Sequence, residues 1–255
     1  MKFIIGFFMA WGNFITLPCP YKRWDNNLKN MMLAMLPGVG LVVGVLWMLL
    51  YAVLDWLVLP PMITSLIMTL YIFLVCGFMH MDGFMDCNDA IMSRRPLEDR
   101  QRILKDSLVG AFAVVTAVFL ILGWFAAMTT AITENHLHTF DVNLLLIPVV
   151  SRGVSGLHVL TLRPIGHSQY VKDYEDKSRI KYRIAVILQM AVVGTAAIFL
   201  GLDPTVTMIV AVTVIASCSI AISYASKNLG GMSGDIAGYG ICISELAGVL
   251  ALALV

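Results

Sequence analysis

The stretch GAFAVVTAVFLILGWFAAMTTAI, from Gly110 to Ile132, decides the fold class of this chain. It contains no charged residue and only a few polar ones. A helix of about 20 mostly apolar residues is long enough to cross a hydrocarbon core of about 30 Å. The stretch therefore predicts a membrane-spanning helix.

The composition of the whole chain agrees with a membrane protein. Its 255 residues are 59% hydrophobic and only 13% charged, whereas soluble domains carry roughly 25% charged residues. No Pro/Ser-rich linker or tandem repeat interrupts the apolar segments, so residues 1–255 are expected to form a single integral membrane domain. The net charge of +1 argues against nucleic-acid binding, and five cysteines without a CxxC pair indicate neither a disulfide framework nor a zinc site.

Further apolar stretches appear when the chain is cut at its charged residues. Six qualify as spans, and a seventh at the C-terminus is shorter and contains Glu245. The N-terminal stretch Phe3–Leu17 is too short to span and predicts an interfacial or re-entrant helix. We therefore expect an all-α, polytopic helical bundle of about seven spans, at residues 33–54, 62–79, 110–132, 143–162, 184–201, 206–224 and 239–255.

The basic residues fall on alternate connections between these spans. Connections 55–61, 134–141 and 201–205 contain no Lys or Arg. Because cytoplasmic loops collect Lys and Arg, the basic connections are expected to face the cytoplasm in a multi-pass cell-membrane protein. Their basic residues are Lys22, Arg23, Lys29, Arg94, Arg95, Arg100, Arg102, Lys105, Arg163, Lys172, Lys177, Arg179, Lys181, Arg183 and Lys227.

An acidic cluster, HMDGFMDCND from His80 to Asp89, follows the second predicted span on the expected cytoplasmic side. Asp82, Asp86 and Asp89 are spaced i, i+4, i+7, which puts all three on one face of a helix. Carboxylates so placed repel each other unless a cation binds, and oxygen ligands suit magnesium or manganese. The alternative, carboxylates stabilised by a helix N-terminus, explains Asp82 but poorly explains acids at a membrane edge.

His80 lies two residues before Asp82 and would point away from the three carboxylates on a continuous helix. Its functional interpretation is a general base or a phosphate contact. A histidine that only forms a hydrogen bond at the membrane interface is the competing interpretation.

The run from His80 to Asp89 resembles the HxDGxxDxxD signature of the cobalamin synthase (adenosylcobinamide-GDP ribazoletransferase) family. The similarity covers most of the chain, although Thr16 and Leu108 stand where the family usually has arginine and Cys242 where an acid is common. Its other elements are the Pro18/Pro20 pair, Pro37, Gly40 and Gly44, Lys105-Asp106-Ser107 with Gly110, Ser151-Arg152, and the glycine-rich block that ends at Glu245.

This resemblance implies a magnesium-dependent phosphotransferase of cobalamin biosynthesis. A hydroxyl of α-ribazole, or of its 5′-phosphate, would attack the phosphate attached to adenosylcobinamide in adenosylcobinamide-GDP, and GMP would leave. Asp82, Asp86 and Asp89 would hold magnesium, and His80 or one of the aspartates would take the proton. The sequence leaves the base, the preferred acceptor and the oligomeric state open.

Several other charged residues are candidate substrate contacts. Arg94, Arg95 and Arg102 follow the cluster and could bind phosphates, although positive-inside topology alone would place basic residues there. Asp106 is marked by the resemblance, and an ion pair with Arg102 is its ordinary alternative.

Arg152 lies near the middle of a predicted span, where a charge needs a partner. We expect that partner to be a substrate phosphate or a cluster carboxylate. The glycines around Asp235 would let backbone amides approach a phosphate or let helices pack closely. Asp235 and Glu245 are therefore further site candidates.

Two other functions are compatible with intramembrane acids. A CDP-alcohol phosphotransferase also uses spaced aspartates and magnesium, but its DGxxAR pattern is missing after Asp82-Gly83. An ion-coupled transporter could use Asp82, Asp235 and Glu245, but the sequence shows no second, inverted copy of the cluster.

Overall fold

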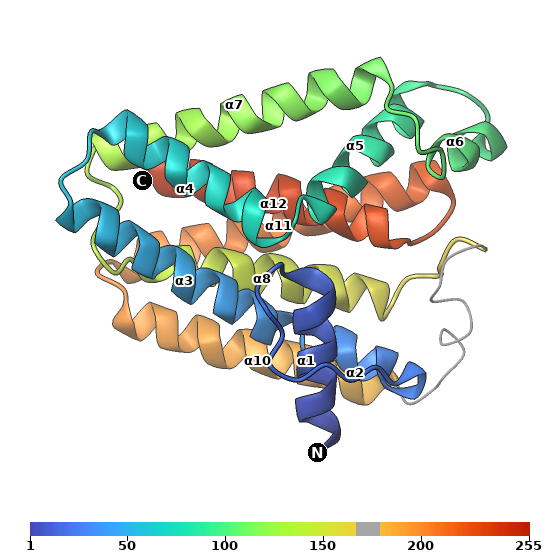
Figure 1. The fold of residues 1–255 in the computed structure, drawn as a ribbon, viewed down its shortest axis with the longest axis horizontal. Coiled ribbons are helices and arrows are strands. Elements are labelled where there is room, and N and C mark those ends of the chain that lie inside the picture. Colours follow the sequence, from blue (N-terminus) through green and yellow to red (C-terminus); the bar gives the residue numbers. More distant parts are fainter. Residues whose placement is uncertain (167–178) are drawn as a thin grey trace.

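The structure, a computed structural model, describes residues 1–166 and 179–255, so Lys172 and Lys177 lie outside the described residues. Long helices run side by side along the longest axis of the molecule (Figure 1). Among the described residues, six helices are long and apolar enough to cross a membrane. They are α3 (Leu36–Trp56), α7 (Ala111–Thr133), α8 (Val142–Val159), α10 (Arg179–Leu200), α11 (Pro204–Leu229) and α12 (Gly234–Leu254). The predicted class, a polytopic helical membrane bundle, is confirmed.

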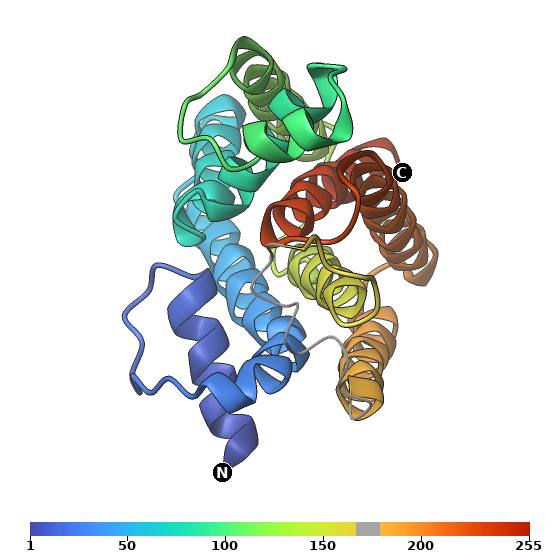
Figure 2. The same ribbon diagram turned by 90° about the vertical axis from the view of Figure 1, so that its right-hand side faces the viewer.

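Among the described residues, the basic α5–α7 connection and the last turn of α11, which contains Lys227, lie at one end of this bundle, on the right in Figure 1. The connections without Lys or Arg gather at the opposite end. Helix α1 (Lys2–Phe14) runs across the long helices rather than along them in Figures 1 and 2, which is the orientation expected of an interfacial helix.

The predicted span 62–79 is wrong in one respect, because it is not one straight helix. Helix α4 (Pro61–Val75) ends early, and α5 (Met79–Met92) continues after a bend of 85°. Gly77 and Phe78 at the break have φ angles of 58° and 59°, a left-handed conformation that ends a helix. The pair counts as a seventh span only if both halves are taken together.

Thr16 stabilises this break from a different part of the chain. Its backbone N–H donates to the Val75 carbonyl at 2.8 Å, and its hydroxyl donates to the Leu74 carbonyl at 3.2 Å. The last carbonyls of a helix lack donors from a following turn. The Leu74 carbonyl accepts from the Gly77 N–H at 3.0 Å, and Thr16 adds donors to both carbonyls.

Helices α8 and α12 form the centre of the bundle, with 78% and 67% of their spanning windows buried, whereas α10 is only 11% buried and lies at the edge. Glycines explain how α3 reaches α8. A Cβ on Gly40 would lie 2.4 Å from the Pro148 carbonyl oxygen, and one on Gly44 would lie 2.5 Å from the Leu145 Cα. Small residues allow such close helix packing in membranes.

Other differences from the sequence prediction are local. Helix α12 begins at Gly234, five residues before the predicted span, because Ser233 caps it by accepting from the Ile236 N–H at 3.3 Å. Residues 234–238 are therefore helical and do not form a glycine-rich loop. The short helices η1 (Asn26–Leu28), α2 (Lys29–Ala34) and α6 (Leu97–Ile103) were not predicted.

Candidate active site

Helix α5 carries the acidic cluster and packs directly on the start of α12. A Cβ on Gly83 would lie 2.7 Å from the Asp235 Cα, and one on Gly238 would lie 2.9 Å from the His80 carbonyl oxygen. Two glycines, one on each helix, thus allow the backbones to touch. Of the glycines around Asp235, Gly238 acts here in helix packing, and the contact brings Asp235 beside the cluster.

A pocket of about 200 Å³ lies where α1, α5, α8 and α12 meet. Four residues that were predicted from the sequence line it together: His80, Asp82, Arg152 and Asp235. The structure therefore joins the acidic cluster to two candidates that are distant along the chain. His80 is buried and Asp82 is exposed, so the pocket runs from the bundle interior to the surface.

The carboxylates form one negatively charged group around Asp86. This half-buried side chain is under the electrostatic influence of Asp82, Asp235 and Asp89. Asp235 is additionally bonded to the Ser233 hydroxyl at 3.2 Å. Like charges this close favour a bound cation or a protonated carboxyl group. The mutual repulsion of carboxylates that the spacing predicted is therefore present in the structure.

Asp89 has a task that the sequence did not indicate. Its two carboxylate oxygens accept from the backbone N–H groups of Gly110 at 2.5 Å and Ala113 at 3.0 Å. These donors belong to the first turn of α7, whose own N-cap residue, Gly110, makes no side-chain capping bond. Asp89 therefore caps α7 from another helix, and it holds the connection that contains Lys105 and Asp106.

No three His, Cys, Asp or Glu side chains within residues 1–166 and 179–255 are arranged to hold a metal ion by themselves. Magnesium rarely needs such a cage, because it commonly binds through one or two carboxylates together with water and substrate phosphates. Asp82 and Asp86 fit that mode of binding. Both oxygens of Asp89 already accept hydrogen bonds from α7 and its N-cap. Magnesium binding by Asp89 stays a prediction.

Arg152 has the acidic partner that its depth requires, but that partner is Glu245 and not a cluster carboxylate. Arg152 Nη1 and Glu245 Oε1 form a buried ion pair, with side chains 1% and 5% exposed. The Ser151 hydroxyl also donates to Glu245 at 2.9 Å, and Arg152 Nη2 donates to the Cys76 sulfur at 3.1 Å. Glu245 does not line the pocket itself, but it binds Arg152, which does.

The guanidinium of Arg152 is not fully used by these bonds. Its Nε is buried and has no hydrogen-bond partner among the described residues. Since Arg152 also lines the pocket, it can offer positive charge to an anion bound there.

The basic residues after the cluster lie outside this pocket. Arg94, at φ 55°, lines a separate surface depression with Arg100. Arg102 pairs with Asp99 at 3.4 Å, and Asp106 accepts from the Leu108 N–H at 3.1 Å. The alternative interpretation of Asp106, an ion pair with Arg102, is therefore wrong. Arg95 is exposed, and its carbonyl accepts from Arg100 at 2.7 Å.

Asn13 and Ser155 also line the pocket and were missed by the sequence analysis. Asn13 was visible as a polar residue near the end of an otherwise apolar N-terminal helix. Ser155 lies one turn after Ser151 on α8, and its hydroxyl donates to the Ala237 carbonyl at 3.2 Å.

A family model and the similar proteins both indicate the same family for this chain. Residues 6–253 match the model of the family described as cobalamin-5-phosphate synthase. The adenosylcobinamide-GDP ribazoletransferase of Clostridium perfringens (strain 13 / Type A) is 32% identical over 97% of this chain and 96% of its own length. That of Clostridium botulinum (strain Alaska E43 / Type E3) is 31% identical over 98% and 97%. No solved structure matches the chain.

Proposed function

The chain belongs to the cobalamin-5-phosphate synthase family, and we propose that it is an adenosylcobinamide-GDP ribazoletransferase. It transfers the adenosylcobinamide-phosphate group to α-ribazole or α-ribazole 5′-phosphate and releases GMP. The observation that carries the proposal is the single pocket that joins His80, Asp82, Arg152 and Asp235.

The reaction exchanges one phosphorus–oxygen bond for another. A ribazole hydroxyl oxygen attacks the phosphorus attached to adenosylcobinamide, the bond from that phosphorus to the GMP oxygen breaks, and GMP leaves with its electron pair. The hydroxyl proton goes to a base on the protein. Such transfers depend mainly on positioning and on neutralising phosphate charge.

Magnesium is part of this proposal, with Asp82 and Asp86 as its protein ligands beside the substrate phosphates. When bound, it would lower the negative charge that repels the attacking hydroxyl. Asp82 is exposed and lines the pocket, and the half-buried Asp86 is close enough to interact with it electrostatically, so a large phosphorylated substrate can reach the ion from the exposed side.

Arg152 and His80 act from the buried side. Arg152 is held in place by Glu245 and directs the positive charge of its guanidinium at a pocket-bound phosphate. His80 lines the same wall and is one candidate for the base, with Asp82 as the other. A His80→Asn variant separates them, because it removes the pH dependence of the rate only if His80 takes the proton.

We assign the pocket to the cytoplasmic end of the bundle, since the basic α5–α7 connection lies at that end (Figure 2 looks onto it). The comparisons favour neither the CDP-alcohol phosphotransferase nor the transporter.

The test is an assay of the full chain in lipid or mild detergent that follows GMP release from adenosylcobinamide-GDP. Release should require both α-ribazole, or its 5′-phosphate, and magnesium. Asp82→Asn should reduce the rate by roughly a hundredfold or more and weaken Mn²⁺ binding measured by electron paramagnetic resonance.

Glu98→Gln is the matched control, because Glu98 is an exposed carboxylate at the same end of the bundle and does not line the pocket. Full activity of Asp82→Asn, or an equal loss in Glu98→Gln, would contradict the proposed site. GMP release without any acceptor would contradict the proposed transfer.

A further inference from the structure

A surface pocket of about 710 Å³ lies between the end of α5, the short helix α6, the first turn of α7 and the last turns of α11. Two arginines, Arg94 and Arg100, line this arginine pocket, and none of its described lining residues is Asp, Glu or His. It shares no described lining residue with the pocket that contains Asp82. The arginine pocket is therefore a separate, positively charged site.

Arg100 is held in place by neutral acceptors. Its Nε donates to the Arg95 carbonyl at 2.7 Å, and its Nη1 donates to the backbone carbonyl and the Oδ1 of Asn228 at 3.0 Å and 3.1 Å. No carboxylate in the described part of the chain pairs with it. The guanidinium is therefore preorganised and keeps its charge for an anion in the pocket.

Arg94 occupies a backbone position that usually belongs to glycine. Helix α5 ends at Met92, Ser93 is its C-cap, and Arg94 follows with a φ angle of 55°. A Cβ makes this left-handed conformation less favourable, which is why glycine is common there. Within residues 1–166 and 179–255, the Arg94 side chain forms no ion pair. A ligand in the pocket that Arg94 lines would explain an arginine at this position.

The arginine pocket lies at the level of lipid headgroups. Helix α7 begins at Ala111 and α11 ends at Leu229, and both helices are long and apolar enough to span a membrane. The ends of such helices lie in the polar headgroup layer, where basic pockets between spanning helices bind anionic headgroups. Phe112 and Tyr224, in the wall of the pocket, are exposed, as is common for aromatic residues at this level.

Apolar surface continues from the pocket toward the middle of the bundle. Val115 and Phe119 follow Phe112 on the same face of α7, and Ile220 precedes Tyr224 by one turn on α11. All of these side chains are exposed. A phosphate that carries acyl chains can therefore contact the arginines and this apolar surface together.

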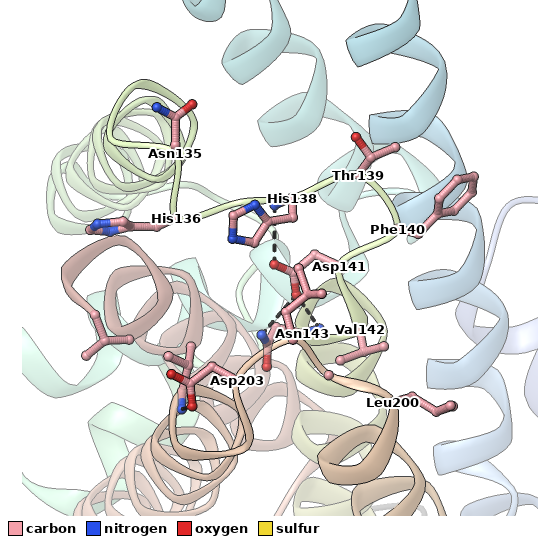
Figure 3. Close-up of a pocket in the computed structure, with 14 residues that line it drawn as sticks. Asn135, His136, His138, Thr139, Phe140, Asp141, Val142, Asn143, Leu200 and Asp203 are labelled. Carbon is pink, nitrogen blue, oxygen red and sulfur yellow. Dashed lines mark hydrogen bonds between the residues drawn. The ribbon is translucent and has the colours of Figure 1, made fainter.

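The opposite end of the bundle has a pocket of contrasting charge (Figure 3). Asp141 and Asp203 line it together with His136 and His138, and none of its described lining residues is Lys or Arg. Of these two pockets, only the arginine pocket offers guanidinium groups to a phosphate. A zwitterionic lipid also carries an ammonium group, for which the arginine pocket has no carboxylate among its described residues. The charges therefore favour a lipid with a net negative charge.

We propose that the arginine pocket binds the phosphate of an anionic phospholipid, with Arg94 and Arg100 as its contacts. The acyl chains lie along the exposed faces of α7 and α11. The inference does not depend on the proposed transferase activity.

The test uses the full purified chain in mild detergent. Phosphatidylglycerol and phosphatidylcholine with identical acyl chains are added in equal amounts, and bound lipid is counted by native mass spectrometry. We expect phosphatidylglycerol to be retained roughly tenfold or more over phosphatidylcholine, since each basic residue at the membrane surface contributes about 1 kcal/mol, a factor of about five. Glycerol 3-phosphate, which has no acyl chains, should not displace the lipid at equal concentration.

Arg94→Gly removes the guanidinium without disturbing the backbone, because glycine suits a φ of 55°. This variant should unfold at the wild-type temperature in lipid-free detergent, and its binding of phosphatidylglycerol should weaken by roughly fivefold. Arg100→Gln should weaken binding by a similar factor.

Lys227→Gln is the matched control. Lys227 is an exposed cation in the last turn of α11, at the same end of the bundle, and it does not line the arginine pocket. Its removal should leave lipid retention within roughly twofold of wild type, because solvent ions screen exposed charges.

Four outcomes would overturn the proposal. The first is equal retention of phosphatidylcholine and phosphatidylglycerol. The second is displacement by glycerol 3-phosphate at equal concentration, which would identify a soluble phosphate as the ligand. The third is unchanged retention in both arginine variants, and the fourth is an equal loss in Lys227→Gln.

Discussion

Replacing Glu245 with leucine tests the buried ion pair with Arg152. The pair lies inside the bundle, with side chains 1% and 5% exposed. Glu245→Leu leaves the guanidinium buried without its counter-charge, and breaking a buried pair in this way costs about 3 to 5 kcal/mol. Arg152 keeps its bonds to the Pro148 carbonyl at 3.3 Å and to Cys76, so we expect the lower value, about 3 kcal/mol.

The double variant Arg152→Met/Glu245→Leu separates stability from activity. With both charges gone, the free energy of unfolding should return to within about 1 kcal/mol of wild type, because apolar residues can replace a buried pair. Activity should not return, since the proposed phosphate contact of Arg152 is missing.

The assay is equilibrium unfolding in mixed micelles at increasing dodecyl sulfate, combined with GMP release under native conditions. If Glu245→Leu is as stable as wild type, the structural role of the ion pair is refuted. A double variant as unstable as Glu245→Leu would refute the charge explanation, and an active double variant would refute the role of Arg152 at the phosphate.

The remaining predictions concern the acidic cluster and its support. Asp89→Ala should lower the free energy of unfolding by about 1 to 3 kcal/mol, because the first turn of α7 loses both acceptors. Asp89→Asn keeps one acceptor oxygen and should lower this free energy less. Equal losses in the two variants would contradict the capping role. Gly83→Ala should reduce both stability and GMP release, since its Cβ would lie 2.7 Å from the Asp235 Cα. Gly194→Ala is its control, with no atom within 4 Å. Chelation of magnesium should stop GMP release, and added magnesium should restore it.

The spans and the acidic cluster could be predicted because each depends on a local pattern. Apolar stretches such as Gly110–Ile132 are visible without any partner, and the structure places a helix at Ala111–Thr133. The family signature from His80 to Asp89 is equally local. The predicted boundaries are least accurate where a few residues decide them, as at Ser233, which starts α12 earlier than hydropathy alone indicates.

The contacts between distant segments could not be predicted from such patterns. The partner of Arg152 lies 93 residues away, and the donors to Asp89 lie 21 and 24 residues away. The break after Val75 depends on Gly77 and on bonds from Thr16, and a single glycine in the apolar stretch 62–79 does not indicate an 85° bend. These features follow from packing.

The contact of α5 with α12 at Gly83 and Gly238 also limits how this site can move. Because backbone meets backbone there, no layer of side chains remains to be compressed or rotated. Asp82 and Asp86 on one helix and Asp235 on the other must then shift as one rigid body. We therefore expect a corrinoid substrate to enter by displacement of the flanking α1, which contributes Asn13 and Phe14 to the pocket wall, and not by a change within the α5–α12 contact.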